Sequence, residues 1–386
     1  MSKKWLGRLL ELVALDTTNP PGKNYRQAMA LLKPWCREAG LKTELVEIPE
    51  KIAKDRVNLL AHRRHPGKPR LLVYSHIDVV PADEDWQPFK PRVEKDKIFG
   101  RGVADMKGSL IAFLAAAEQV KDQKLPWDLT LMITTDEETN QKAQVEYLLD
   151  RKIDQVKGAV FLDIDSTFGY VSIGGLGHIA VKITVHGKAV HSGISHTGVN
   201  AIEKAVPILN ALMKLKEKVE ARFSQIPVNP ELGIEKMQAK LNIDVIAGGK
   251  KVNIVPDRCQ IEVDRRLIPE ESVGQAQEEI RQALEPLKDQ VDFDLEFVHS
   301  MAGYGQVSPA ARKLAQIMKQ VTGQGELYGV MGSGDLLAMA ADYDWQFAGL
   351  GVIRDKESNA HGRLENVYLE DLDVVTKILK RFLLQA

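Results

Sequence analysis

The sequence has few cysteines, almost no net charge and no long apolar run, and each absence narrows what the protein can be. Its two cysteines, Cys36 and Cys259, lie far apart and lack the short spacing of a metal or redox motif. The formal net charge of −1 gives no electrostatic reason to bind nucleic acid or an anionic membrane. No stretch approaches the roughly 18 consecutive apolar residues of a membrane-spanning helix, and Arg8 and Glu11 interrupt the apolar residues near the amino terminus, unlike a secretory signal peptide. We therefore expect a cytoplasmic protein that binds neither nucleic acid nor membranes.

The fractions of hydrophobic and charged residues are those of an ordinary globular protein. Hydrophobic residues make up 44% and charged residues 27% of the 386 positions, and a chain of this length usually forms more than one domain. In its first half, short runs rich in Val, Ile and Leu alternate with amphipathic segments. The expected strands are 57–62, 70–76, 129–135 and 158–164, and 108–123 is an expected helix. This alternation predicts an α/β fold with helices flanking a mostly parallel sheet, in which ligands gather at the carboxyl ends of the strands.

The pattern changes after a glycine-rich turn at 173–178. Apolar and polar residues then alternate along several segments, which are separated by expected helices at 200–221 and 272–288. Alternation with period two is typical of antiparallel strands that are buried on one face only. A helix expected at 308–323 returns to the first pattern. The sequence therefore predicts an α+β domain at 178–299, inserted into a catalytic domain formed by 1–177 and 300–386.

Three adjacent acids, Asp136, Glu137 and Glu138, follow the apolar segment 129–135. Neighbouring like charges disfavour each other's ionisation, so each carboxylate needs water or a cation. A solvated loop is the simple interpretation. The alternative is that a strong positive charge, such as a pair of divalent cations, neutralises the acids at this end of the strand.

Other residues that can bind metal occupy similar places. His76 and Asp78 share a face of a strand, and a metal-bound imidazole usually donates its second N–H to such a carboxylate. Asp105 precedes the expected helix in a glycine-rich turn, Asp165 follows a buried strand, and His361 lies late in the chain. One at a time, a core histidine, a helix cap or a chance acid explains each of them. Together they supply one imidazole and carboxylates to each of two sites, a set suited to Zn²⁺ or Co²⁺ rather than Mg²⁺.

Four segments carry a resemblance to a known family: SHIDVVP (75–81), GRGVADMKG (100–108), TTDEE (134–138) and AH (360–361). In their order and spacing they resemble the M20-type dinuclear zinc metallopeptidase and deacylase family. That family includes acetylornithine deacetylase, succinyl-diaminopimelate desuccinylase, aminoacylase, carboxypeptidase G2 and carnosine dipeptidases. The resemblance implies a zinc-peptidase-like catalytic domain, an inserted lid domain that also forms a homodimer, and two divalent cations. Zn²⁺ is favoured, with Co²⁺ or Mn²⁺ as alternatives.

The resemblance also implies a role for each residue of the catalytic domain. His76 and Asp165 would hold one cation, Glu138 and His361 would hold the other, and Asp105 would bridge the two. Asp78 would orient His76. Glu137 would be the general base that takes a proton from the attacking water and passes it to the departing amine. The peptide after Asp105 resembles one that the family keeps in the cis form.

In the inserted domain, the resemblance singles out a histidine and an arginine. His191 of HGKAVHSG (186–193) would stabilise the oxyanion of the reacting carbonyl, often in the partner subunit's site. Arg266, which ends NIVPDRCQIEVDRR (253–266), would contact a substrate carboxylate. The less favoured alternative is that both are ordinary exposed polar residues. Backbone N–H groups of Gly332, Ser333 and Gly334 could cradle the same carboxylate.

Departures from the family pattern leave the substrate open. Deacetylases and desuccinylases usually carry Glu-Pro-Thr where this chain has Asp165, Ser166 and Thr167, and an aspartate there is closer to the dipeptidase and aminoacylase branches. Asp163 is a competing ligand, and MGSG (331–334) replaces a more familiar Gly-Gly-Thr-Asp segment. The expected reaction is hydrolysis of the amide bond of a small, acid-bearing N-acyl amino acid.

Three alternatives to this reaction remain. A dipeptidase or carboxypeptidase would use the same cations. A metal-binding protein without catalysis is disfavoured, because binding alone has no need of Glu137. A nucleotide-binding α/β protein is disfavoured, because neither the dinucleotide nor the phosphate-loop glycine pattern is present.

Overall fold

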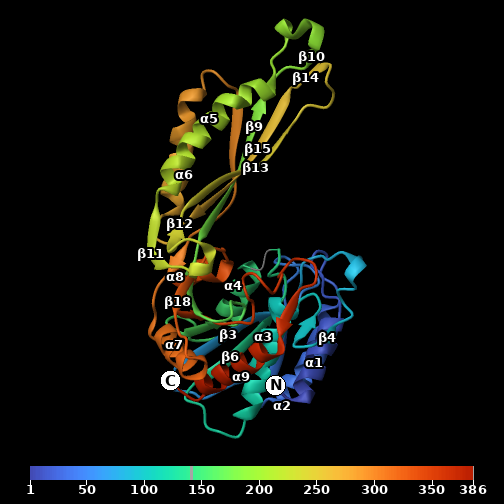
Figure 1. The fold of residues 1–386 in the computed structure, drawn as a ribbon, viewed down its shortest axis with the longest axis vertical. Helices are drawn as coiled ribbons and strands as arrows, with labels where there is room; N and C mark the ends of the chain where they lie inside the picture. Colours follow the sequence, from blue (N-terminus) through green and yellow to red (C-terminus); the bar gives the residue numbers. More distant parts are fainter. Residues whose placement is uncertain (140–141, 386) are drawn as a thin grey trace. The chain divides into compact units, whose positions relative to one another are not determined.

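The computed structural model describes residues 1–139 and 142–385, and the chain divides into two compact units (Figure 1). The first unit consists of Met1–Ile173, Val307–Tyr328 and Ala340–Ala386. The second unit consists of Gly174–Gln306 and Gly329–Met339. Three elements cross the division between them: β8 (Val171–Gly175), β18 (Leu327–Val330) and α8 (Asp335–Asp342). In the two described ranges, no helix combines the length and the apolarity needed to cross a bilayer.

A twisted central sheet forms the core of the first unit. Its strands, in spatial order, are β1 (Lys42–Glu47), β2 (Val57–Arg63), β6 (Asp128–Thr134), β3 (Arg70–His76), β7 (Val160–Asp163), β19 (Gln346–Gly349) and β8. The four strands from β6 to β19 run parallel, and the strands on either side of them are antiparallel. Every residue of β3 and β6 is buried, as expected for strands that are covered on both faces.

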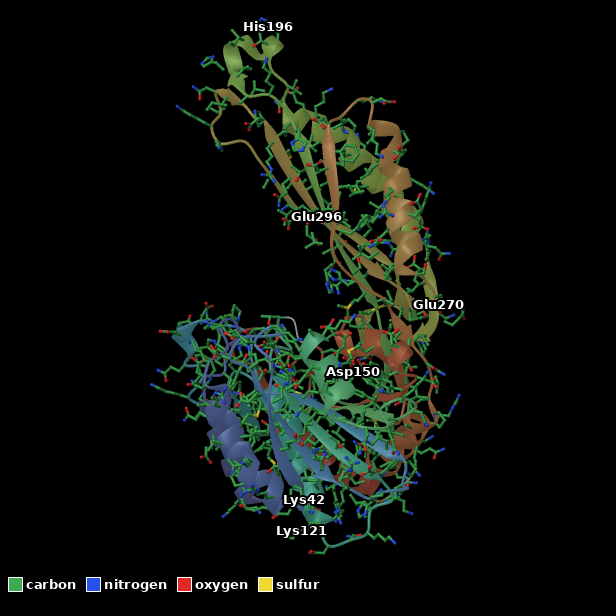
Figure 2. All side chains as sticks on the ribbon, turned by 180° about the vertical axis from the view of Figure 1, so that it is seen from behind. Lys42, Lys121, Asp150, His196, Glu270 and Glu296 are labelled. Atoms are coloured by element: carbon green, nitrogen blue, oxygen red, sulfur yellow. The ribbon has the colours of Figure 1, made fainter. Side chains whose placement is uncertain are left out.

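Helices cover the faces of this sheet, and α3 and α9 cross one face next to each other (Figure 1). The helices of the unit are α1 (Lys3–Ala14), α2 (Tyr25–Glu38), α3 (Gly108–Gln119), α4 (Lys142–Arg151), α7 (Pro309–Thr322) and α9 (Leu369–Leu383). Local signals define α7 clearly: the Ser308 side chain accepts from Ala311 N–H, and Gly323 ends the helix in the left-handed conformation. Figure 2 marks the end of the unit where the parallel strands begin, with Lys42 and Lys121.

A small antiparallel sheet lies beside the central one in the first unit. It consists of β4 (Arg92–Glu94), β5 (Lys97–Phe99) and β20 (Asn366–Tyr368), with β5 in the middle. A short 3₁₀ helix (Glu84–Trp86) precedes it. Because β5 pairs with β20, the glycine-rich turn after residue 99 meets the segment that ends at residue 365.

The second unit is an antiparallel sheet that is covered on one face by helices. The sheet has the order β13 (Lys240–Gly248), β15 (Arg258–Leu267), β9 (Gly177–His186) and β16 (Phe293–Met301), the last marked by Glu296 in Figure 2. Alternate residues of β9 are buried against α5 (Ala201–Glu220) and α6 (Val273–Leu284). The smaller elements are β10 (Val190–His191), β11 (Phe223–Pro227), β12 (Lys236–Gln238), β14 (Ile254–Val255), β17 (Tyr304–Gly305) and 3₁₀ turns at Ser192–Thr197, Pro230–Leu232 and Glu285–Leu287.

This architecture confirms the predicted α/β fold with a central, largely parallel sheet between helices. The expected strand 70–76 coincides with β3, and the expected helix 108–123 is α3, which ends four residues earlier at Gln119.

Candidate metal centre

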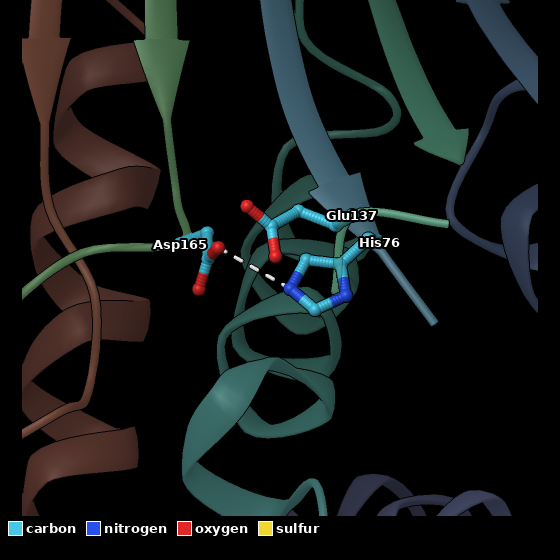
Figure 3. A group of neighbouring side chains, drawn as sticks. All are labelled: His76, Glu137 and Asp165. Carbon is cyan, nitrogen blue, oxygen red and sulfur yellow. Dashed lines mark ion pairs between the residues drawn. The ribbon is translucent and has the colours of Figure 1, made fainter. Parts of the chain in front are cut away.

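The parallel strands of the first unit end along one edge of the sheet, where the predicted site residues follow them. His76 is the last residue of β3, Glu137 and Glu138 follow β6, and Asp165 follows β7. Parallel strands present their carboxyl ends at the same edge, so residues far apart in sequence meet there. Figure 3 shows the side chains of His76, Glu137 and Asp165 pointing toward one another from these strand ends.

Two groups of side chains gather at this edge, each able to offer three ligand atoms within 4.8 Å of one another. The first group contains His76, Glu137 and Asp165. The second group contains Asp105, Glu138 and His361. The structure therefore brings together all five residues expected to be ligands, and it places Glu137, expected to be the base, among them.

Asp105 connects the two groups. Its Oδ1 lies 3.2 Å from His76 Nε2, and its Oδ2 lies 3.0 Å from His361 Nε2. Each imidazole faces a second carboxylate as well: His76 Nε2 lies 3.2 Å from Asp165 Oδ2, and His361 Nε2 lies 3.1 Å from Glu138 Oε2. One carboxylate with an oxygen toward each histidine is the arrangement that a bridging ligand needs.

Asp105 reaches this position from an irregular turn, Val103–Lys107, and not from a helix cap. The cap residue of α3 is Lys107, and no side chain caps that helix end. The alternative that Asp105 serves as a helix cap is therefore wrong. The peptide between Asp105 and Met106 is cis, which agrees with the resemblance.

Asp78 is fully buried and contacts the far side of His76. Its Oδ1 lies 3.3 Å from His76 Nδ1, and its Oδ2 accepts hydrogen bonds from Glu138 N–H at 3.1 Å and Asn19 Nδ2 at 3.2 Å. A carboxylate at Nδ1 leaves Nε2 to face the carboxylates of the site. Asp78 thus holds both a histidine of the first group and the backbone of an acid of the second.

The first of the three adjacent acids has a different source of positive charge from the one expected. Asp136 turns away from the two groups and forms an ion pair with Arg56, whose Nε lies 2.7 Å from Asp136 Oδ2. Tyr25 OH, Asn19 Nδ2 and Gln144 Nε2 also donate hydrogen bonds to this buried carboxylate. The expectation that cations neutralise all three acids is therefore wrong for Asp136. Its burial beside Arg56 fixes the loop so that Glu137 and Glu138 point to the site.

Asp163, the competing ligand, supports Asp165 instead of joining either group. Its Oδ1 accepts a hydrogen bond from the backbone N–H of Asp165 at 3.0 Å. Asp163 is the last residue of β7, so this contact fixes the first turn of chain beyond the strand.

The pKa values of these side chains are shifted by burial and by the excess of negative charge at the site. Burial raises the pKa of the Glu137 carboxyl well above its usual value, and the nearby carboxylates of Asp165 and Asp105 raise it further. Burial also raises the pKa of Glu138 and of Asp165. Hydrogen bonds to Asp105 and Glu138 raise the pKa of His361 to about 10. Protons thus compete for the positions that a cation would take, and cation binding must displace them.

The site also contains buried polar atoms without hydrogen-bond partners. Among the described side chains, His76 Nε2, Asp105 Oδ1 and Asp78 Oδ1 are buried and make no hydrogen bond, although each faces an oppositely charged group within 3.3 Å. Buried polar atoms normally find partners, so buried atoms of this kind are typical of a site that binds an ion. Imidazoles and carboxylates in this number fit two divalent cations of the zinc type.

The residues singled out in the inserted segment lie in the second unit. Arg266, at the end of β15, donates from Nη1 to Ser333 Oγ at 3.0 Å, and its Nε pairs with Asp264 Oδ2 at 2.8 Å. Ser333 also donates to Gly177 O, so Arg266 and the turn 332–334 form one cluster. His191, in β10, is exposed, and its Nδ1 accepts from Gly193 N–H.

Sequence reasoning missed several residues that support the site. Arg56, Asn19 and Tyr25 hold Asp136, Glu365 accepts a hydrogen bond from the turn that carries Asp105, and Arg101 pairs with Glu365. Apart from Arg101, which lies in GRGVADMKG, these residues match no motif, and the partners named here lie 80 to 264 positions away. The only signal in the sequence was the run of three adjacent acids that contains Asp136, because such a run needs positive charge nearby.

Comparison with known proteins agrees with this geometry. The chain is 32% identical over 263 residues to acetylornithine deacetylase of Aliivibrio fischeri, an alignment that spans 67% of this chain and 65% of that enzyme. Its fold matches an M20 family metallo-carboxypeptidase from Sulfolobus solfataricus, with a TM-score of 0.78 and 19% identity over 99% of both chains. It also matches a dinuclear metal-binding peptidase of the M20 family from Bacillus subtilis, with a TM-score of 0.69 and 13% identity over 99% and 98% of the two chains.

A profile of peptidase family M20/M25/M40 matches residues 72–385, a range that holds every residue of both ligand groups. A match over so much of the chain, with the site residues in their places, decides the relationship: this protein belongs to peptidase family M20/M25/M40.

Proposed function

We propose that the protein is a metal-dependent hydrolase that cleaves the amide bond of small N-acyl amino acids. The observation that carries the proposal is Asp105, whose two oxygens face His76 and His361, beside a buried Glu137. His76 and Asp165 would hold one cation, and Glu138 and His361 the other. Zn²⁺ is the first choice for this donor set, with Co²⁺ or Mn²⁺ as alternatives. When bound, such a pair of cations lowers the pKa of a water molecule toward neutrality and polarises the carbonyl of the substrate.

The chain's own residues would carry the proton through the reaction. Glu137 accepts a proton from the attacking water, and the water oxygen bonds to the carbonyl carbon. His191 donates a hydrogen bond to the oxyanion that develops. Glu137 then returns the proton to the amide nitrogen as the C–N bond breaks, which releases a carboxylic acid and an amine.

The substrate would carry a free carboxylate, because Arg266 and the turn 332–334 form a cluster that could bind a carboxylate. The guanidinium of arginine and the N–H groups of a glycine turn are both common partners of carboxylates. A dipeptidase or carboxypeptidase is the second candidate, because an aspartate, Asp165, occupies the position where deacetylases and desuccinylases of the family usually carry glutamate.

A substrate panel tests the proposal and separates the two candidates. We expect the Zn²⁺- or Co²⁺-loaded protein to hydrolyse N-acetyl, N-formyl or N-succinyl amino acids faster than dipeptides, and a chelator to abolish this activity. Replacing the free carboxylate by an amide should raise KM, and Arg266→Met should raise KM for the acids more than for the amides. Faster hydrolysis of dipeptides would favour the second candidate. No hydrolysis of any amide with either metal would overturn both.

The second unit supports a further part of the proposal, a cytoplasmic homodimer. Its sheet has an edge strand, β13, that exposes Val245 and Ile246 beside a helix, α5, that exposes Ile202, Val206 and Met213. An edge strand with exposed apolar side chains is a ready surface for pairing with a second copy. Cys36 and Cys259 are unpaired and buried, in keeping with a reducing compartment.

Breaking this apolar surface should produce monomers. We expect the parent protein to have the mass of a dimer in light scattering after size-exclusion chromatography, and Val206→Glu combined with Ile246→Lys to halve it. The control is Val298→Lys on β16, the opposite edge strand, where the side chain is 59% exposed compared with 56% for Ile246. A dimer that persists in the double variant, or a parent that is monomeric at high concentration, would contradict the prediction.

A further inference from the structure

A buried ion pair between Arg101 and Glu365 lies next to the second ligand group of the first unit. Arg101 Nη1 lies 2.7 Å from Glu365 Oε2, and the two side chains are 3% and 1% exposed. β5 and β20 bring the pair together, because Phe99 pairs with Asn366 and Gly100 N–H donates to Glu365 O. Neither residue is a member of a ligand group.

Glu365 holds the turn that carries Asp105. Its Oε1 accepts hydrogen bonds from the backbone N–H groups of Ala104 at 2.9 Å and Asp105 at 3.1 Å. Its Oε2 accepts from Gly102 N–H at 2.9 Å, in addition to Arg101. Gly102 has a φ of +82°, and an added Cβ would lie 2.5 Å from Val79, so this backbone approach needs a glycine. A single carboxylate therefore accepts from three backbone N–H donors within four residues of an irregular turn.

Arg101 holds the backbone of another residue of the same group, His361. Its Nη2 donates to the backbone carbonyl oxygens of His361 at 3.1 Å and Gly362 at 3.2 Å. His361 has a positive φ of 63°, and its side chain is 55% exposed, so little packing fixes it. The guanidinium of Arg101 thus connects the backbone of His361 to the Glu365 carboxylate. That carboxylate in turn holds the backbone of Asp105.

We propose that Arg101 and Glu365 are positioning residues that hold Asp105 and His361 at the spacing a cation of the second group needs. The inference deepens the proposed function, since it concerns the same site, but it makes a claim about cation binding that does not depend on any substrate. Partners that orient a ligand typically change metal affinity by about 10–100-fold when they are removed. The first ligand group also faces Asp105, but it has its own supports in Asp78 and Asp163 and does not include His361, so it should respond less.

Two variants test this role without deleting a side chain. Each carboxylate oxygen of Glu365 accepts from two N–H donors. In Glu365→Gln, the amide N–H₂ replaces one of these oxygens in either orientation, so two hydrogen bonds are lost and donors face donors. In Arg101→Lys, the charge remains, but a single ammonium cannot form the fork that reaches Glu365 and both carbonyls. Co²⁺ titration of the chelator-treated protein, followed by visible absorption and with a competing chelator, measures the affinity of each equivalent.

We expect the parent to bind two Co²⁺ ions, and each variant to bind one of them about 10–100-fold more weakly, with a changed absorption band for that equivalent. The matched control is Asp128→Asn, which breaks an equally buried ion pair, Arg70–Asp128, also at 2.7 Å. Arg70 and Asp128 begin β3 and β6, so this pair lies at the far ends of the strands that lead to the site. The control should lose thermal stability and keep both Co²⁺ affinities.

The outcomes separate this inference from the proposed function. Unchanged affinities in both variants, an equal loss in Asp128→Asn, or a parent that binds only one Co²⁺ would overturn the role of the pair. A parent that binds two Co²⁺ ions and hydrolyses no amide would overturn the hydrolase proposal, and a selective loss of one equivalent would still establish the role of Arg101 and Glu365.

Discussion

Glu137→Gln should lower kcat by about 10²- to 10⁴-fold, the usual contribution of a general base, and leave two divalent cations bound. Glutamine has the same size as glutamate but cannot accept the proton of the attacking water at neutral pH. Burial already raises the affinity of Glu137 for a proton, so the carboxyl is suited to hold a proton between its two transfers. KM should change little, because substrate binding does not depend on this proton.

The same variant decides between two roles for Glu137, since its carboxylate lies within ligand distance of His76 and Asp165. A base that is not a ligand predicts lost turnover with full metal content, measured by elemental analysis after dialysis. A ligand predicts that one cation is lost as well. Glu146→Gln on α4 is the control, because it makes the same chemical change at a side chain that is 43% exposed. Turnover of Glu137→Gln at the parental rate would exclude both roles.

Asp105→Ala should abolish activity and weaken the binding of both cations. Removal of a partner that only orients a ligand costs about 10–100-fold in metal affinity, so loss of a ligand shared by both groups should cost more. Asp105→Asn refines the test, because asparagine keeps one oxygen. That oxygen can face His76 or His361 but not both, and the amide N–H₂ repels a cation on the other side. We expect one tightly bound cation in Asp105→Asn and none in Asp105→Ala.

Elemental analysis and Co²⁺ titration of the two Asp105 variants measure this difference, and thermal unfolding of the metal-free proteins shows whether the fold is intact. The turn 103–107 has backbone supports from Glu365, which both substitutions leave in place. Two cations bound with parental affinity in Asp105→Ala would contradict the bridge.

The sequence was sufficient to predict four strands of the sheet of the first unit: β2, β3, β6 and β7. Continuous apolar runs such as β3 and β6 can be buried only in the middle of a covered sheet, and their ends fix where His76 and Glu138 lie. The convergence of the two ligand groups then follows from parallel strands. The place of His361 could not be predicted from periodicity, because this residue lies in the loop between β19 and β20.

The supports of the site were not predictable in this way. The interaction of Asp136 with Arg56 joins residues 80 positions apart, and nothing near Arg56 in the sequence distinguishes it from the other arginines. Arg101 lies within a recognised segment, but its partner Glu365 is 264 positions away and belongs to no motif. Electrostatic reasoning correctly required positive charge beside three adjacent acids. The sequence did not indicate that Asp136 pairs with Arg56, so that only Glu137 and Glu138 belong to the ligand groups.

The second ligand group draws on both sides of the inserted unit, with Asp105 and Glu138 before it and His361 after it. During synthesis on the ribosome, Asp105 and Glu138 emerge while His361 is still missing. Glu365, the partner of Arg101, is missing as well. A nascent chain that stalls within the insertion therefore carries two of the three residues of this group. Under the proposed function, we expect such a fragment to be inactive until translation has passed the insertion and reached residue 365.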